Sequence, residues 1–180
     1  MILGDNMKKI IIFLILLFTF INVNASEKIE VKLKACVDGD TAKLIINKKV
    51  KTVRFLAIDT EESVSKKKEN TYMGKVASNY TCDKLTTAKK IEIEYDPASN
   101  KEDKYNRTLA WVYTDGMLLQ EDLVKNGYAK VTYLYGDYLY TEDLLVYEDM
   151  AKLKHIGIWQ DDNYIEILYN FALKILKLFT

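Results

Sequence analysis

The stretch Val53–Glu62 reads Val-Arg-Phe-Leu-Ala-Ile-Asp-Thr-Glu-Glu, and the rest of the chain is best understood outward from it. It begins as an apolar run typical of a buried strand, interrupted by Arg54, whose fixed charge is costly there unless an anion meets it. It ends in three carboxylates within four positions, Asp59, Glu61 and Glu62, where the strand should give way to a loop. Hard oxygen ligands beside a forked phosphate binder predict a metal-assisted reaction on a phosphate ester.

A second acidic cluster, Asp38-Gly39-Asp40-Thr41, lies about twenty residues earlier. Taken singly, each feature has a simpler interpretation. Asp-Gly favours a solvated turn for backbone reasons, and the aliphatic stem of Arg54 can cover a core while its head reaches water. The functional hypothesis rests on the combination and order of the stretches, which also include Asp103–Arg107.

The flanking sequence is typical of short strands and helices. Ile29–Val37 alternates apolar and charged residues, the period of a half-buried strand. The same reasoning predicts strands at Thr41–Ile46, Val50–Ile58, Lys90–Tyr95 and Thr108–Thr114, an extended, tyrosine-rich segment at Ala129–Tyr135, and helices at Gly74–Leu85, Leu118–Asn126 and Thr141–His155. Ser63–Thr71 is predicted as a mobile polar loop. Short strands with a helix inserted after the third predict an α+β fold, a small barrel with packed helices; strand spacing alone also fits several kinds of small barrel.

The first 25 residues resemble a secretory signal peptide. Met7-Lys8-Lys9 is basic, Ile10–Val23 is almost wholly apolar, and Val23-Asn24-Ala25 resembles a cleavage site. An uncleaved membrane anchor is the alternative, although it needs a longer apolar span. We expect an exported protein, either secreted or attached at the cell surface, with a folded domain over residues 26–160.

The charge balance and the cysteines say little about function. Removing Lys8, Lys9 and Asp5 with residues 1–25 changes 26 basic and 26 acidic residues to 24 and 25. A net charge of −1 gives no general attraction for nucleic acid, so binding must come from a local patch. The chain has two cysteines, Cys36 and Cys82. Whether they form a disulfide is left open, because the number of residues between them does not give their distance in space.

The tail over residues 161–180 is unusually apolar. Residues 164–179 contain neither Gly nor Pro and predict an amphipathic helix with a wide apolar face. At 16 residues with three charges this segment is a poor membrane span. It either packs back on the domain or mediates membrane-surface attachment or self-association.

The motifs together resemble the staphylococcal nuclease (thermonuclease) family over about Lys32–Trp159. The matching stretches are Asp38–Thr41, Arg54 with Asp59 to Glu62, Asp103–Arg107, Ala129–Tyr135 and Gly157–Trp159. This chain has Glu61 where the family usually has Pro, and Asn106 where it usually has Gly. The resemblance implies a five-stranded OB-fold β-barrel with three packed helices, to which this chain adds the C-terminal helix. It also implies calcium-dependent hydrolysis of DNA and RNA that leaves 3′-phosphate ends.

The resemblance also implies a role for each site residue. Calcium would be held by Asp40, Asp59 and the carbonyl of Thr60, and the phosphate by Arg54 and Arg107. Glu62 would act as general base. Tyr105, Tyr133 and Tyr135 would bind single-stranded or frayed DNA and RNA, with Lys67 and Lys68 attracting phosphate. No protein partner can be identified.

One geometric conflict and two other functions stay open. In a regular strand Arg54 and Asp59 face opposite sides, so the strand must end or bulge between them if both serve one site. A catalytically silent nucleic-acid-binding module of this family is the main alternative, although the catalytic set Arg54, Glu62 and Arg107 is present. A small barrel that binds oligosaccharide or protein would not explain that set.

Overall fold

The computed structural model describes residues 27–62 and 72–160. Its elements are β1 (Lys28–Asp38), β2 (Thr41–Ile46), β3 (Lys49–Phe55), β4 (Ile58–Thr60), α2 (Tyr72–Thr87), β5 (Ile91–Glu94), β6 (Thr108–Thr114), β7 (Met117–Leu118), α3 (Leu119–Lys125), β8 (Ala129–Val131), α4 (Thr141–Leu153) and the 3₁₀ turn η1 (Gly157–Trp159). The predicted signal peptide, the loop with Lys67 and Lys68, and the C-terminal helix lie outside these ranges.

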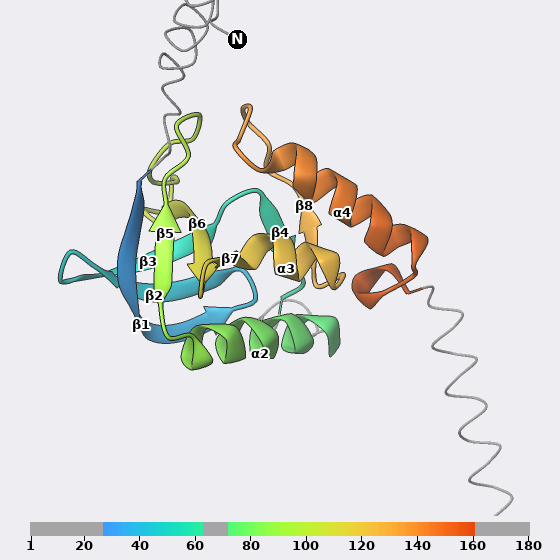
Figure 1. Ribbon diagram of the computed structural model, residues 1–180, viewed down its shortest axis with the longest axis horizontal. Helices are drawn as coiled ribbons and strands as arrows, with labels where there is room; N and C mark the ends of the chain where they lie inside the picture. The colour runs from blue at the N-terminus through green and yellow to red at the C-terminus, as the bar shows by residue number, and fades with distance from the viewer. Residues whose placement is uncertain (1–26, 63–71, 161–180) are drawn as a thin grey trace, which may run out of the picture.

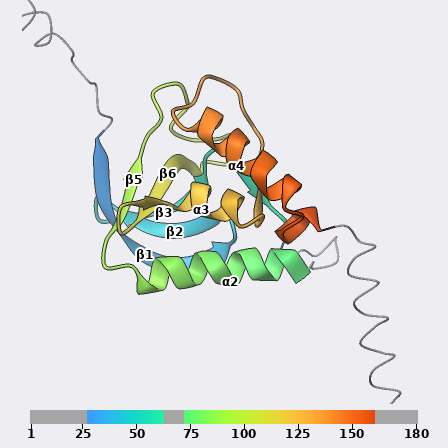
Figure 2. The ribbon, with the colours of Figure 1, turned by 45° about the vertical axis from the view of Figure 1, so that its right-hand side comes forward.

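The strands form a barrel in the order β3-β2-β1-β5-β6, with the short β7 added at β6. The barrel closes because β3 also pairs with β6 in parallel, Val53 opposite Thr108 and Phe55 opposite Ala110. Figure 1 shows α2 across the lower end of the barrel and α4 packed on α3 at its side, and Figure 2 shows the same layers after rotation. In the described part of the chain, five strands close a mixed barrel and three α-helices cover it, which confirms the predicted α+β fold class.

Local sequence explains why the hairpins form where they do. The β2–β3 turn places Asn47 at φ 48° and Lys48 at φ 65°, and the β6–β7 turn places Asp115 at φ 51° before Gly116. Two consecutive positive φ angles are the geometry of a tight hairpin turn whose twist matches the flanking strands. The core between these strands is filled by large buried side chains, among them Trp111, Phe55, Leu44 and Ile58.

The predicted strand Val50–Ile58 is wrong as a single element. The structure ends β3 at Phe55 and starts β4 at Ile58, and Ala57 between them has φ 62°. The predicted extended segment Ala129–Tyr135 is likewise shorter, because β8 ends at Val131. Among the described residues, no helix is both long and apolar enough to cross a membrane.

A disulfide joins the two cysteines whose pairing the sequence left open. Cys36 in β1 and Cys82 in α2 are 46 residues apart in sequence, with their Cα atoms 5.5 Å apart. The bridge therefore ties the inserted helix to the strand that leads into the Asp38–Thr41 turn.

Replacing both cysteines with alanine is expected to lower the free energy of unfolding by about 4 kcal/mol, because a closed loop of this length restricts the unfolded chain. Urea unfolding of the parent and of the Cys36→Ala/Cys82→Ala variant measures the difference. Thiol titration of denatured, unreduced parent is the control. Two titratable thiols would contradict the bridge.

Candidate active site

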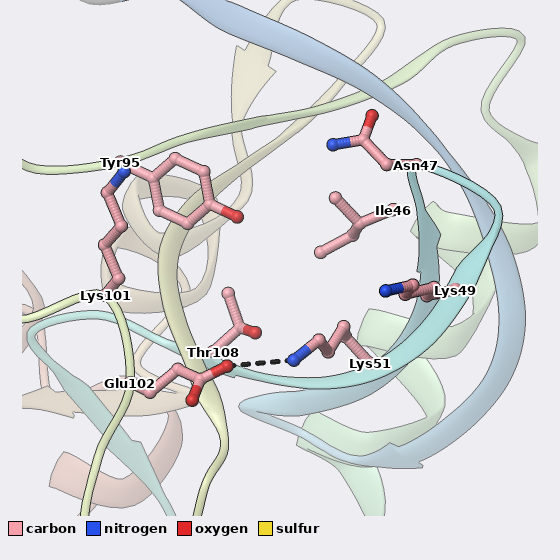
Figure 3. Close-up of a pocket in the computed structure, with 8 residues that line it drawn as sticks. All are labelled: Ile46, Asn47, Lys49, Lys51, Tyr95, Lys101, Glu102 and Thr108. Atoms are coloured by element: carbon pink, nitrogen blue, oxygen red, sulfur yellow. Dashed lines mark hydrogen bonds and ion pairs between the residues drawn. The ribbon is translucent and has the colours of Figure 1, made fainter.

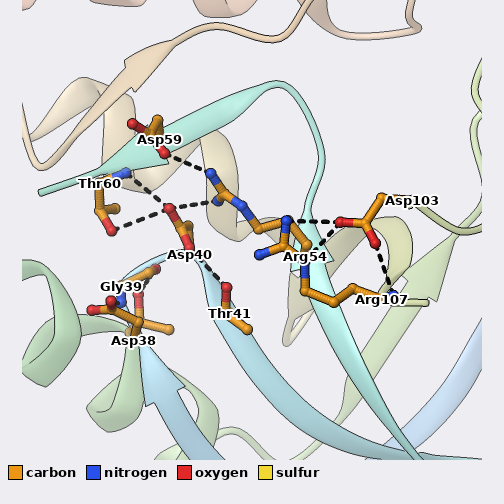
Figure 4. A network of polar contacts seen from close by, with 10 residues as sticks. Asp38, Gly39, Asp40, Thr41, Arg54, Asp59, Thr60, Asp103 and Arg107 are labelled. Atoms are coloured by element: carbon orange, nitrogen blue, oxygen red, sulfur yellow. Dashed lines mark hydrogen bonds and ion pairs between the residues drawn. The ribbon is translucent and has the colours of Figure 1, made fainter. Parts of the chain in front are cut away.

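Arg54 joins the two acidic stretches that the sequence places about twenty residues apart. Its Nη1 lies 2.5 Å from Asp40 Oδ2, and its Nη2 donates a hydrogen bond to Asp59 Oδ1 at 2.6 Å. Figure 4 shows the guanidinium between the two carboxylates. The Arg54 side chain is 9% exposed and that of Asp40 is 10% exposed, so most of this ion pair is removed from water. The two acidic clusters therefore lie on either side of the Arg54 guanidinium, which contacts a carboxylate of each.

The break between β3 and β4 makes this arrangement possible. Residues five apart in a continuous strand face opposite sides. Here the chain turns at Leu56 and Ala57 before Asp59, and the Leu56 amide donates to the carbonyl of Ala110 on β6. The geometric conflict between Arg54 and Asp59 is resolved by this turn.

Asp40 is fixed by hydrogen bonds to both of its oxygens. Oδ2 accepts from the Thr60 amide at 2.9 Å and from Thr60 Oγ1 at 3.3 Å, while Oδ1 accepts from Thr41 Oγ1 at 2.8 Å. The neighbouring Gly39 is needed because a Cβ there would lie 2.7 Å from Thr60 Oγ1. Helix α2 supports the same turn, since Thr81 Oγ1 donates to the Gly39 carbonyl at 2.6 Å.

The two carboxylates are not fully balanced by positive charge. Partial burial raises the pKa of Asp59; Arg54 opposes this shift, and the nearby negative charge of Asp40 adds to it. Lys130, which pairs with Asp59 between β4 and β8, gives a smaller opposing effect. A site with two carboxylates and one close guanidinium favours an additional cation.

Arg107 is held by Asp103 in the loop before β6. Arg107 Nε and Nη2 both lie 2.7 Å from Asp103 Oδ2, and Asp103 Oδ1 accepts from the amides of Arg107 and Tyr105 at 2.9 and 2.8 Å. Burial alone would raise the pKa of Asp103, but these hydrogen bonds outweigh it and lower that pKa. Asn106 takes φ 60° in this loop, as expected for a residue that tolerates the left-handed region.

Asp103 is a positioning residue that sequence reasoning did not assign to the site. Its charge looked like one of several in a solvated loop. The sequence did contain one indication of this role. Asp103 lies four residues before Arg107, and an Asp side chain can accept hydrogen bonds from backbone amides a few residues later in the chain.

Two of the predicted tyrosines lie beside the arginines. The Tyr105 ring centroid is 5.4 Å from Arg107 Cζ, and the Tyr133 centroid is 5.7 Å from Arg54 Cζ. Tyr105 is 66% exposed and Tyr133 is 49% exposed, so each keeps a surface for a ligand. Tyr135 is 83% exposed, and the ring contacts of the described residues do not include it.

The last acidic residues lie at the edge of the described segment. Glu62 is exposed and follows Thr60 by two residues. The backbone there is close to the start of α2, because a Cβ on Gly74 would lie 2.5 Å from the Glu62 carbonyl oxygen. Within residues 27–62 and 72–160, no group of three or more His, Cys, Asp or Glu side chains is arranged to hold a metal ion.

Replacing Asp103 with asparagine is expected to lower kcat/KM by about tenfold, because a hydrogen bond to a charged group contributes about 1.5–3 kcal/mol and Arg107 loses its carboxylate. Steady-state kinetics with denatured DNA measures the change in kcat/KM, and urea unfolding measures any change in the free energy of unfolding. Asp115→Asn is the matched control. Asp115, in the β6–β7 turn, also accepts hydrogen bonds from two backbone amides at 2.9 Å, those of Lys89 and Lys90, but it has no contact with Arg107 in the described structure. Equal loss of activity in both variants would contradict a specific role for Asp103.

Residues 52–161 match the family described as Staphylococcal nuclease homologue. Endonuclease YncB of Bacillus subtilis (strain 168) is 37% identical over 146 residues, which are 79% of this chain and 67% of that protein. The SPbeta prophage-derived endonuclease YokF of the same strain is 38% identical over 143 residues, which are 77% of this chain and 47% of that protein.

A thermonuclease of Staphylococcus hyicus is 32% identical over 140 residues, which are 77% of this chain and 79% of that protein. The aligned part therefore spans about half of the prophage endonuclease and most of the staphylococcal enzyme. The match to the family extends over more than half of the chain and includes Arg54, Asp59 and Arg107. This chain belongs to the staphylococcal nuclease homologue family.

Proposed function

We propose that this protein is an exported, calcium-dependent nuclease that hydrolyses phosphodiester bonds of DNA and RNA and leaves 3′-phosphate ends. The observation that carries the proposal is the Arg54 guanidinium within 2.5–2.6 Å of Asp40 and Asp59. Arg107 immediately precedes β6, whose Leu109 pairs with Arg54, so both arginines belong to one part of the barrel. Relatives named endonuclease and thermonuclease support the same activity.

The donors at this site suit a hard cation. Calcium takes six to eight oxygen ligands at about 2.3–2.6 Å, and the available oxygens are the carboxylates of Asp40 and Asp59 and the backbone carbonyl of Thr60. The raised pKa of Asp59, caused by burial and by the charge of Asp40, fits a place that gains from positive charge. The described residues contain no group of three or more acidic, His or Cys side chains that could hold a metal ion. The remaining calcium ligands would therefore be water and substrate oxygens. When bound, calcium would neutralise charge on the phosphate.

The arginines would hold the phosphate and its developing charge. Arg54 Nη1 is buried; it forms an ion pair with Asp40 Oδ2, but among the described residues it makes no hydrogen bond. A buried donor without an acceptor costs free energy, and a phosphate oxygen would satisfy it. Arg107 presents a second planar fork, already oriented by Asp103. Two such forks suit the equatorial oxygens of an attacked phosphodiester.

In this proposal, Glu62 would activate the attacking water. It is exposed, and it lies two residues from Thr60, which holds Asp40. A carboxylate there would accept the proton of the attacking water, work that typically contributes about 10²–10⁴-fold. Tyr105 and Tyr133 would stack on bases of single-stranded or frayed substrate, and Tyr135, Lys67 and Lys68 would add outer contacts.

Export is supported by the apolar leader and by the cysteines. A disulfide between Cys36 and Cys82 is typical of an oxidising compartment outside the cytoplasm. Residues 1–25 have the charge and hydropathy pattern of a secretory signal.

Calcium is expected to switch cleavage on, and a chelator is expected to abolish it. Denatured DNA and RNA are incubated with the mature protein in calcium, in magnesium and in chelator, and the end groups of the products are identified. Magnesium should substitute poorly, because it demands stricter octahedral geometry. Undiminished cleavage in chelator would overturn the metal assignment, and binding without cleavage in calcium would leave the silent binding module.

A further inference from the structure

A hollow of about 690 Å³ opens at the mouth of the barrel, apart from the carboxylates of the active site. Its walls come from the β2–β3 hairpin, the residue after β5, the loop before β6 and the first residue of β6: Ile46, Asn47, Lys49, Lys51, Tyr95, Lys101, Glu102 and Thr108. Figure 3 shows Lys49 and Lys51 on one side of the opening and Tyr95 and Lys101 on the other. We call this hollow the barrel mouth.

The barrel mouth is strongly biased towards positive charge. It contains three lysines, Lys49, Lys51 and Lys101, and one carboxylate, Glu102. Lys51 Nζ lies 2.9 Å from Glu102 Oε1, and both side chains are more than 40% exposed. The remaining two lysines give the opening a net charge of about +2 in a chain that is nearly neutral overall, the kind of local patch that attracts anions.

Two chain segments that line the barrel mouth also carry residues of the active site. On β3, Lys51 precedes Arg54 by three residues, a rise of roughly 10 Å, and the two side chains point to opposite faces of the strand. On the other side, Thr108 lines the mouth and directly follows Arg107. A polyanion bound at Arg54 and Arg107 would therefore have to extend by roughly 10 Å and cross to the other face of β3 to reach the lysines.

An aromatic side chain accompanies the charges. Lys101 Nζ lies 5.2 Å from the centroid of the Tyr95 ring. Lysines interleaved with an aromatic ring are typical of surfaces that bind single-stranded nucleic acid, where the cations attract phosphates and the ring contacts a base or sugar. Barrels of this kind bind about 4–16 nucleotides, more than the nucleotides beside the scissile bond.

We propose that the barrel mouth is a second subsite, which binds the backbone phosphates of the polynucleotide strand that flanks the scissile bond. Lys49 and Lys101 contact these phosphates, and Lys51 exchanges Glu102 for a phosphate when the strand is bound. The inference rests on the proposed nuclease function, and it makes a polynucleotide rather than a mononucleotide ester the preferred substrate.

The test compares oligonucleotide lengths by fluorescence anisotropy in chelator, where cleavage is absent. The probes are labelled oligothymidylates of two and eight nucleotides. The Lys49→Ala/Lys101→Ala variant should bind the octamer roughly tenfold more weakly and the dimer as the parent does. The slope of log K against log salt concentration for the octamer should become shallower by about 1.4, since each lost contact to a single strand accounts for about 0.7.

Two further variants separate this subsite from a general charge effect. Lys34→Ala/Lys89→Ala removes the same charge from exposed positions on β1 and before β5 and should bind both probes as the parent does. Glu102→Gln removes the competing carboxylate and should bind the octamer several-fold more tightly without changing dimer binding. Circular dichroism checks that each variant is folded.

The outcomes distinguish the subsite from the enzymatic proposal. If the parent binds the octamer no more tightly than the dimer, or the Lys49→Ala/Lys101→Ala variant keeps the parental octamer affinity and salt slope, the subsite is wrong. Cleavage in calcium with such unchanged binding would remove the subsite and keep the nuclease. Length-dependent binding that needs these lysines, in a protein that does not cleave, would keep the subsite and remove the nuclease.

Discussion

Replacing Glu62 with glutamine is expected to lower kcat on denatured DNA by roughly 10²–10⁴-fold, because a neutral amide cannot accept the proton of the attacking water. Binding of the oligonucleotide should change little, since the amide has nearly the same shape and we assign the phosphate contacts to Arg54 and Arg107. The measurement is steady-state cleavage in calcium beside anisotropy in chelator. A large fall in kcat with an unchanged dissociation constant marks an interaction made in the transition state.

Glu61 supplies the matched control for this prediction. It is the adjacent carboxylate, and Glu61→Gln removes the same charge from the same segment. This variant should keep kcat within a few-fold of the parent. If Glu62→Gln retained parental turnover, or if both variants lost it equally, Glu62 would not be the base and the segment would act only through its charge.

Much of the fold could be predicted because its signals are local. The strand β2 coincides with the predicted Thr41–Ile46, and the Asn47-Lys48 turn follows it directly. In these places the alternation of apolar residues and the preference of Asn for positive φ act within a few residues. The rest of the barrel then determines only which strands these segments pair with.

The break between β3 and β4 could not be located from the sequence, because it leaves no local signal. Phe55, Leu56, Ala57 and Ile58 are all apolar and all buried, and the residue with positive φ is Ala57 rather than Gly or Asn. The barrel determines this turn through β6 and the Asp40 carbonyl, to which Leu56 and Phe55 donate their amides. The only indication was indirect, namely the requirement that Arg54 and Asp59 share a site.

The site shows the same division between local and long-range information. Chemistry and order of motifs were enough to name Asp40, Arg54 and Asp59, and the structure brings these three together. The anchoring of Arg107 by Asp103 was missed, because a charged loop and a hydrogen-bonded loop have similar compositions. The Cys36–Cys82 pair was left open, since sequence separation does not specify Cα distance.

Replacing Arg54 with methionine is expected to give the largest combined loss of activity and stability in the described site. Methionine keeps much of the apolar stem but leaves Asp40 buried and Asp59 half-buried without their shared cation. Removing one partner of a buried ion pair typically costs about 3–5 kcal/mol, because the other charge stays desolvated. Loss of the guanidinium should also lower kcat by roughly 10²–10³-fold, the usual effect of removing one donor to a developing oxyanion.

The stability loss should depend on pH with a definite sign. Burial already raises the pKa of Asp59, and Arg54 opposes that shift, so its removal should raise the pKa further. A carboxyl with a raised folded-state pKa is most costly when ionised, above that pKa, and the cost disappears as pH falls through it. The deficit of Arg54→Met relative to the parent should therefore be large near pH 7 and smaller near pH 5, measured by urea unfolding in chelator.

Arg107→Met is the control that separates catalysis from folding. Its ion pair with Asp103 is more exposed, 34% for the Arg107 side chain, and exposed pairs contribute only about 0–1 kcal/mol. This variant should lose turnover as Arg54→Met does, while its unfolding free energy stays close to that of the parent. If Arg54→Met were as stable as Arg107→Met at both pH values, the two carboxylates would not need Arg54, and the charge imbalance that we infer at Asp40 and Asp59 would be wrong.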